Sequence, residues 1–281
     1  MDYKEKVYVG ALTWLGTLGE RRYLGQMRDV LAVYELGSRY AGYYTENSDY
    51  DYMVVYMPSP HDLMYPTTIY KQETEIDGNK VEVKYISIME YVYRIENGDL
   101  EALQMLNATS SQSFFGEPIE GIDNKRTRLV TYMKELEYRR ETFTYLAPEK
   151  LFRGINGRIK ATKTRMDKAI ENDDMEVAVK CAILIRYFMD LLVVLADGES
   201  IREGLTFSPI IANIIREFRK DCESAQAKTL INTAQALLEA DREEILNSIK
   251  DHELSDGYAQ SVRQYSLTGR LIDVLLGGYY D

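Results

Sequence analysis

Apolar and polar residues alternate along the first part of the chain in patterns that predict a mixture of helices and strands. Helical spacing of apolar residues predicts a helix over Arg21–Leu31, and the apolar run Ala32–Leu36 predicts a strand that ends at Gly37. A second strand is predicted over Asp49–Met57, after a loop rich in turn-forming and aromatic residues. The first strand therefore stops at a Gly-Ser pair, and the second begins among aspartates.

Two further runs alternate with the period of two that is typical of strands. Ile69–Ile76 and Lys80–Ile88 are rich in β-branched residues and flank Asp77-Gly78-Asn79, which predicts a β-hairpin. Helices are then predicted over Ile88–Ile95 and Leu100–Leu106. We expect a first domain over residues 1–115.

Helical periodicity replaces the strand signals beyond residue 115. The predicted helices lie at Asp123–Tyr145, Pro148–Asn172, Met175–Leu195, Ser208–Lys220, Lys228–Lys250 and Gly257–Leu276. The sequence thus predicts an α+β protein, in which a small mixed β-sheet domain with flanking helices is followed by an all-α domain over residues 116–281.

Composition and charge narrow the class of protein. The 281 residues are 45% hydrophobic and 28% charged, which is ordinary for a globular protein. No apolar run approaches the roughly 20 residues that span a membrane, and the charged start Met1–Lys6 is unlike a signal peptide, so we expect a cytoplasmic protein. The net charge of −11 argues against tight nonspecific binding of nucleic acid. Any contact with a polynucleotide should be local.

Candidate chemistry is concentrated between the first two predicted strands. Gly37 and Ser38 can present backbone N–H groups and a hydroxyl to phosphate oxygens, because glycine has no side chain to block their approach. Asp49 and Asp51 are two residues apart on a strand, so both carboxylates point to the same face. Mg²⁺ is usually held by one or two carboxylates together with substrate phosphates. The stretch therefore predicts a nucleoside triphosphate site.

A third carboxylate is expected from the predicted hairpin. Glu82 faces away from its apolar neighbours, on a strand that can pair beside the one carrying the aspartates. Its alternative role is a surface charge that pairs with Lys80 or Lys84. The nearest rivals for the third position are Glu73 and Glu75 on the preceding strand.

The order of these residues resembles the DNA polymerase β superfamily of nucleotidyltransferases, whose pattern is Gly-Ser, a loop, Asp-x-Asp on a strand and a third acid on a later strand. More narrowly, the motif is similar to the branch linked with RNA repair, which also occurs in bacteriophages. Nine positions match that branch, namely Gly37, Ser38, Arg39, Gly42, Thr45, Ser48, Asp49, Tyr50 and Asp51. Glu82 departs from the pattern, since the family more often has Asp at the third position.

The resemblance implies an enzyme that uses Mg²⁺ or Mn²⁺ and a nucleoside triphosphate. It implies catalytic and metal-binding roles for Asp49, Asp51 and Glu82. The residues that it implies in nucleotide binding are Gly37, Ser38, Arg39 and Ser48. In the implied reaction an acceptor hydroxyl attacks the α-phosphorus and pyrophosphate leaves. The acceptor would be an RNA end, or alternatively a protein hydroxyl; a nucleotide-binding regulatory protein without turnover is the third hypothesis.

Several aromatic and basic residues near the motif have two interpretations. Arg39 contacts the triphosphate or pairs with Glu46. Tyr43, Tyr44 and Tyr50 stack on a base or simply pack. Farther along, a cluster of cations on one predicted helix is unusual for an acidic protein and is either a grip for an RNA backbone or a solvated helix face. Its candidate acceptor-binding residues are Arg153, Arg158, Lys160, Lys163 and Arg165.

Overall fold

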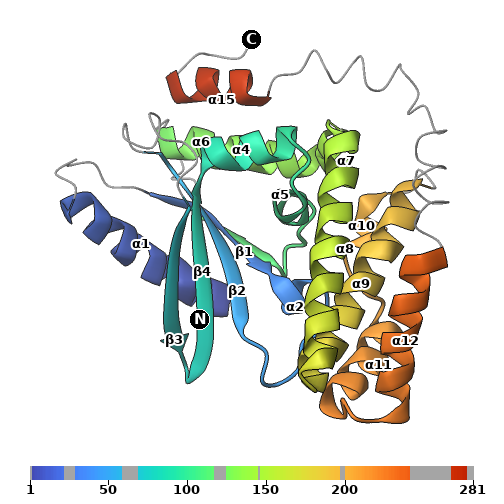
Figure 1. Ribbon diagram of the computed structural model, residues 1–281. Coiled ribbons are helices and arrows are strands. Elements are labelled where there is room, and N and C mark those ends of the chain that lie inside the picture. The colour runs from blue at the N-terminus through green and yellow to red at the C-terminus, as the bar shows by residue number, and fades with distance from the viewer. Residues whose placement is uncertain are drawn as a thin grey trace. The chain divides into compact units, whose positions relative to one another are not determined.

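The computed structural model describes residues 2–21, 29–58, 69–116, 125–144, 146–196, 200–240 and 267–276. The chain forms two compact units, shown by ribbon in Figure 1. The sheet unit comprises Met1–Tyr40, Asp49–Ala147 and Val262–Asp281, and the helical unit comprises Ala41–Ser48 and Pro148–Ser261. The predicted α+β class is confirmed. Within the described residues, no helix is long and apolar enough to cross a bilayer.

The sheet unit is built on five strands in the order β3-β4-β2-β1-β5. β2 and β4 run parallel, and the other neighbours are antiparallel. The strands are β1 (Val30–Leu36), β2 (Tyr50–Tyr56), β3 (Tyr70–Ile76), β4 (Asn79–Ser87) and β5 (Ser113–Phe115). The predicted hairpin is confirmed, with Asp77 and Gly78 at φ 51° and 79° in the turn between β3 and β4. Positive φ at both central residues is what a tight hairpin turn requires.

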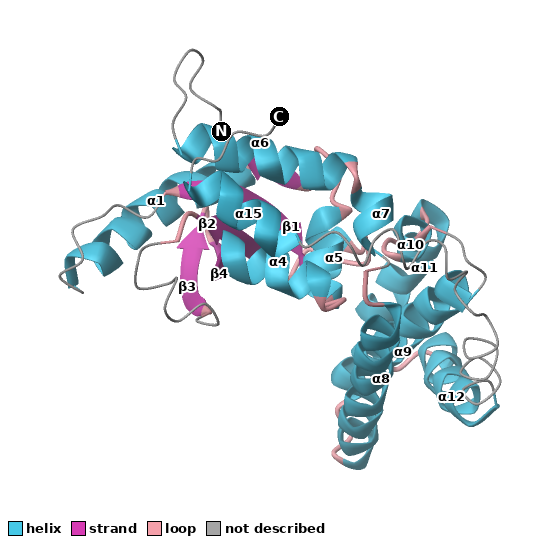
Figure 2. Cartoon of the chain, turned by 90° about the horizontal axis from the view of Figure 1, so that it is seen from above, coloured by secondary structure: helices cyan, strands magenta, loops and turns pink. Residues whose placement is uncertain are grey.

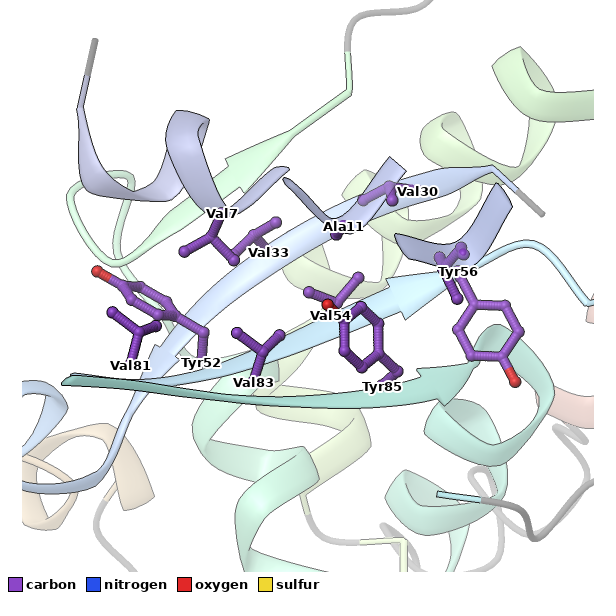
Figure 3. Close-up of a cluster of buried hydrophobic side chains, with 11 residues drawn as sticks. Val7, Ala11, Val30, Val33, Tyr52, Val54, Tyr56, Val81, Val83 and Tyr85 are labelled. Carbon is purple, nitrogen blue, oxygen red and sulfur yellow. The ribbon is translucent and has the colours of Figure 1, made fainter. Parts of the chain in front are cut away.

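One face of the sheet packs against α1 (Tyr3–Arg21). Val7, Ala11 and Leu15 recur every four residues along this helix, which brings them to one side, and all three are buried in a common cluster with strand residues. Figure 3 shows the strand side chains of this cluster rising from the same face of the sheet toward α1. Alternation therefore directs the intervening residues of each strand, Asp51 and Glu82 among them, to the opposite face.

The opposite face carries most of the remaining helices of the sheet unit. They are α2 (Gly37–Tyr40), α4 (Ile88–Glu96), α5 (Leu100–Leu106), α6 (Lys125–Tyr138), α7 (Arg140–Thr144) and α15 (Leu267–Leu276). α4 contacts β2 and β4, while α5 and α6 contact β1. Figure 2 shows α15 beside α4 and α6, where the Tyr132 hydroxyl donates to the carbonyl of Leu267 at 2.9 Å and Arg270 pairs with Glu135 at 3.0 Å.

The helical unit packs around α9 (Met175–Ala196), most of whose described side chains are buried or half-buried. The others are α8 (Pro148–Glu171), α10 (Ile201–Gly204), α11 (Pro209–Lys220) and α12 (Ala225–Ala240), and each of them contacts α9. The predicted helices agree with this set except for α10, which the sequence did not indicate. The predicted segments 241–250 and 257–266 lie outside the described residues.

Two predictions require correction. The helix predicted over Arg21–Leu31 is wrong at its end, because Val30 and Leu31 belong to β1; residues 22–28 lie outside the described residues. The division of the chain also differs from the predicted boundary after residue 115. α6, α7 and α15 belong to the sheet unit because they pack on β1 and α4, whereas the loop Ala41–Ser48 belongs to the helical unit.

Candidate active site

The end of β1 and the start of β2 form the centre of the candidate site. Leu36 pairs with Asp51 across the antiparallel ladder, so the turn at Gly37 begins directly beside the Asp51 carboxylate. Gly37 has φ +67°, a conformation that favours glycine. A Cβ at this position would overlap Asp51 Oδ2 and would lie 3.1 Å from Cγ. The backbone of the Gly-Ser turn and the second aspartate are therefore in direct contact.

Three acidic residues form a row across β2, β4 and β3. Asp51 is in register with Glu82, and Glu82 is in register with Glu73. Neighbouring strands lie about 4.8 Å apart, so these side chains are adjacent on the face opposite α1. Asp49 precedes β2 by one residue and is exposed. Like charges opposite one another destabilise a sheet unless a cation neutralises them.

Two lysines of β4 pair with acids of the site. Lys80 Nζ lies 3.9 Å from Asp49 Oδ2, and Lys84 Nζ lies 3.8 Å from Glu82 Oε1. Over the described ranges, no three His, Cys, Asp or Glu side chains are gathered closely enough to hold a metal ion. Two of the acids, Asp49 and Glu82, are instead oriented toward a lysine. Glu82 thus has both features: it pairs with a lysine, as the surface-charge interpretation expects, and it belongs to the row of acids.

The residue types and their spacing nevertheless fit a hard divalent cation. Mg²⁺ takes carboxylate oxygens at about 2.0–2.1 Å, and adjacent strands bring two carboxylates within reach of one ion. Asp51 meets this condition with Glu82 through the strand register. Asp49 lies two residues before Asp51, and extended backbone at that spacing directs both side chains to one side. The rivals Glu73 and Glu75 lie one strand farther away, on β3.

Ser38 and Arg39 follow Gly37 in α2 but differ in their surroundings. Ser38 is half-buried next to the Gly37 turn. The Arg39 guanidinium stacks over the Tyr50 ring at 3.5 Å, and Tyr50 stacks on Tyr3 of α1 at 4.5 Å. Tyr50 leaves β2 on the face opposite Asp51, the face that packs against α1.

Glu35 lies on the same face of the sheet as Tyr50, near the Arg39 guanidinium. Its burial raises the pKa of the carboxyl group, and the nearby positive charges of Lys4 and Arg39 oppose the shift. Tyr52 lies in the same surroundings, and its burial raises the pKa of the phenol above its usual value. The positive charge of Arg39 thus acts on a half-buried acid.

Ser48 has hydrogen-bond partners within the helical unit. Its Oγ accepts hydrogen bonds from the Thr45 backbone N–H at 2.9 Å and from Arg219 Nη1 at 3.2 Å. Arg219 also donates to the Tyr43 carbonyl at 3.2 Å, and Arg216 donates to the Gly42 carbonyl at 3.1 Å. Sequence reasoning missed both arginines of α11, since nothing in the motif indicates a partner so distant in the chain. Ser48 therefore lies in a loop that hydrogen bonds from α11 stabilise.

The candidate acceptor-binding cations occupy two sides of α8. Arg153 and Lys160 are seven residues apart, and both are exposed. Lys163 and Arg165 are also exposed, while Arg158 is half-buried. Arg153 pairs with Glu149 at 3.4 Å, and Lys163 pairs with Asp167 at 2.7 Å. The buried side of the helix consists of Leu151, Ile155, Ile159, Met166 and Ala169. Most of these cations are thus available to solvent.

Comparison with known proteins adds little to this geometry. No protein-family model matches the sequence, and no curated protein matches it significantly. A crystal structure of a nucleotidyltransferase-like protein from Exiguobacterium sibiricum aligns with 94% of this chain and 90% of its own chain, at 9% sequence identity and a TM-score of 0.28. A likeness of this extent does not establish a shared fold. The arrangement of residues has to carry the functional argument.

Proposed function

We propose that this protein is a nucleotidyltransferase, which moves a nucleoside monophosphate from a nucleoside triphosphate to an acceptor hydroxyl and releases pyrophosphate. The observation that carries the proposal is the contact between the Gly37 turn and the Asp51 carboxylate, with Glu82 in register beside it. Nine positions at fixed spacing resemble the nucleotidyltransferase motif. The pairing of β2 with β4 supports a joint role for the acids that these strands carry.

Each group has a defined task in the proposed site. Asp49, Asp51 and Glu82 would hold Mg²⁺ or Mn²⁺, which supplies charge neutralisation to the phosphates and activates the attacking hydroxyl. The Gly37 turn presents its backbone to the triphosphate without a blocking side chain. Ser38 donates its hydroxyl hydrogen to a phosphate oxygen. The acceptor oxygen forms a bond to the α-phosphorus while the bond to the pyrophosphate oxygen breaks.

We infer that the acceptor is an RNA end, because exposed cations on α8 supply the charge that an otherwise acidic chain lacks. Arg158, Lys160 and Arg165 make no ion pair with any residue that the structure describes. Cations without a carboxylate partner neutralise phosphates at the lowest cost. A protein hydroxyl is the other acceptor to test, since docking a protein does not depend on such a cluster.

The proposal is tested by incubating the protein with each α-labelled nucleoside triphosphate, Mg²⁺ and either RNA or cell lysate. We expect label on RNA together with release of pyrophosphate. Label on lysate proteins instead would assign a protein acceptor. Binding of nucleotide without release of pyrophosphate under any of these conditions would leave a regulatory protein and overturn the enzyme proposal.

A further inference from the structure

Lys84 follows Glu82 by two residues in β4, so the two side chains lie on the same face of the strand. Val81, Val83 and Tyr85 alternate with these two residues and are buried on the other face, at 0%, 2% and 1% exposure. The Lys84 side chain is 26% exposed, so its ammonium group is only partly screened by water. Its charge therefore acts on the row of acids with less screening than that of Lys80, whose side chain is 60% exposed.

The Lys84 ammonium is shared between two carboxylates. Its Nζ lies 3.8 Å from Glu82 Oε1 and 3.7 Å from Glu101 Oε1, in the first turn of α5. Both distances exceed the 2.7–3.2 Å of an N–H···O hydrogen bond. The attraction is thus electrostatic and leaves the Glu82 carboxylate able to turn, because no directional bond fixes it.

A second layer of charges holds the other partner in place. Arg94 Nη1 lies 3.7 Å from Glu101 Oε2, and Arg94 Nε donates to Glu90 Oε1 at 2.8 Å. Glu90 is buried at the start of α4. Charges therefore alternate from Glu82 through Lys84, Glu101 and Arg94 to Glu90. When Glu82 turns away, Lys84 keeps a partner in Glu101.

We propose that Lys84 is a positioning residue that neutralises the acidic row in the absence of a divalent cation and passes to Glu101 when the cation binds. This inference rests on the proposed function only through the divalent cation site, since it requires metal binding but not nucleotidyl transfer. Lys84 competes with the metal for Glu82, and it prevents the three acids from repelling one another before metal arrives. The metal then binds to a row that is already ordered.

The competition gives Lys84 a signature that a merely structural residue lacks. Removing its charge should strengthen metal binding, because a positive charge about 4 Å from a ligand opposes the approach of a dication. At saturating metal the effect on transfer should be small, because Lys84 has then passed to Glu101. Loss of a residue needed only for folding would instead weaken metal binding and transfer together.

The experiment is a calorimetric titration of the full chain with Mn²⁺, in the wild type and in Lys84→Met, Lys84→Gln and Lys84→Arg. We expect the first two variants to bind Mn²⁺ roughly three- to tenfold more tightly, and Lys84→Arg to remain within about twofold of the wild type. Lys71→Met is the matched control, since Lys71 faces Lys84 across the β3–β4 register and is exposed. Its affinity should stay within about twofold of the wild type.

The outcomes separate this inference from the proposed function. Unchanged or weaker Mn²⁺ binding in both Lys84→Met and Lys84→Gln, at wild-type thermal stability, would overturn the role of Lys84. Tighter binding in these variants, in a protein that transfers no nucleotide to any acceptor, would support Lys84 and refute the enzyme. A wild-type protein that binds no Mn²⁺ would overturn both.

Discussion

Replacing Gly37 by alanine tests the contact on which the candidate site depends. The new Cβ would overlap Asp51 Oδ2 and would lie 3.1 Å from Cγ and 3.3 Å from Cβ of the same side chain. Gly37 also has φ +67°, which is strained for alanine. The substitution therefore has one effect on the backbone and a second effect on the position of a proposed ligand.

The two effects have different magnitudes. The left-handed backbone conformation costs alanine about 1–2 kcal/mol, and a displaced Asp51 rotamer adds roughly 0.5–1.5 kcal/mol. Gly78 is the matched control, because it has φ +79° and an added Cβ would meet nothing within 4 Å. Gly78→Ala should lose only the backbone part. In an Asp51→Ala background, the cost of Gly37→Ala should fall to that of Gly78→Ala.

Denaturant unfolding and a transfer assay together decide this prediction. Gly37→Ala should reduce nucleotidyl transfer by about 100-fold or more, because a displacement of 1 Å at a reacting centre has an effect of that size. Gly78→Ala should transfer at the wild-type rate. If Gly37→Ala keeps wild-type transfer and metal affinity, Asp51 is not a ligand in this site.

Other predictions concern the phosphate turn, the basic helix and a buried acid. Ser38→Ala should weaken nucleotide binding by about 1–3 kcal/mol, and equal affinity in Ser38→Ala and the bulky Ser38→Trp would place the phosphates elsewhere. Lys160→Ala with Lys163→Ala should flatten the salt dependence of RNA affinity by roughly 0.7 per charge. Lys134→Ala on α6 together with Arg139→Ala, just after its end, should leave the slope unchanged. Burial raises the pKa of Glu137 from its ordinary 4.5 to about 7. The unfolded chain loses this proton at a lower pH than the folded chain does. The wild type should therefore lose stability relative to Glu137→Gln as pH rises from 4.5 to about 7, with no further loss above that. A constant difference in stability over this range would refute the shift in pKa.

The hairpin and the two strands of the site were predictable because their information is local. Alternation and the Asp77-Gly78 turn define β3 and β4, and the spacing of Asp49 and Asp51 predicts a common face for their carboxylates, although β2 begins only at Tyr50. The start of β1 was not predictable in the same way. Val30 and Leu31 fit a helical spacing as well as a strand, and pairing with β2 decides between them.

Other features depend on contacts that no local pattern contains. Arg39 follows Ser38 in the motif, yet its position depends on Tyr50, which faces α1 and provides the stacking surface. Ser48 is bound by Arg219 of α11, far along the chain. The unit boundary falls after Ala147 because α6 packs on β1, which helical periodicity alone does not indicate.

The central claim is that acids of β2 and β4 serve nucleotidyl transfer, and exchanging carboxylates for amides tests it most directly. The measurement is transfer of α-phosphate label at saturating Mg²⁺ in Asp51→Asn and Glu82→Gln, beside Glu73→Gln, which removes the neighbouring acid of the same row. A neutral amide cannot replace a carboxylate ligand of a hard dication. The account predicts that the first two variants fold normally and lose transfer, while Glu73→Gln retains it. Wild-type transfer in Asp51→Asn or Glu82→Gln would contradict the account.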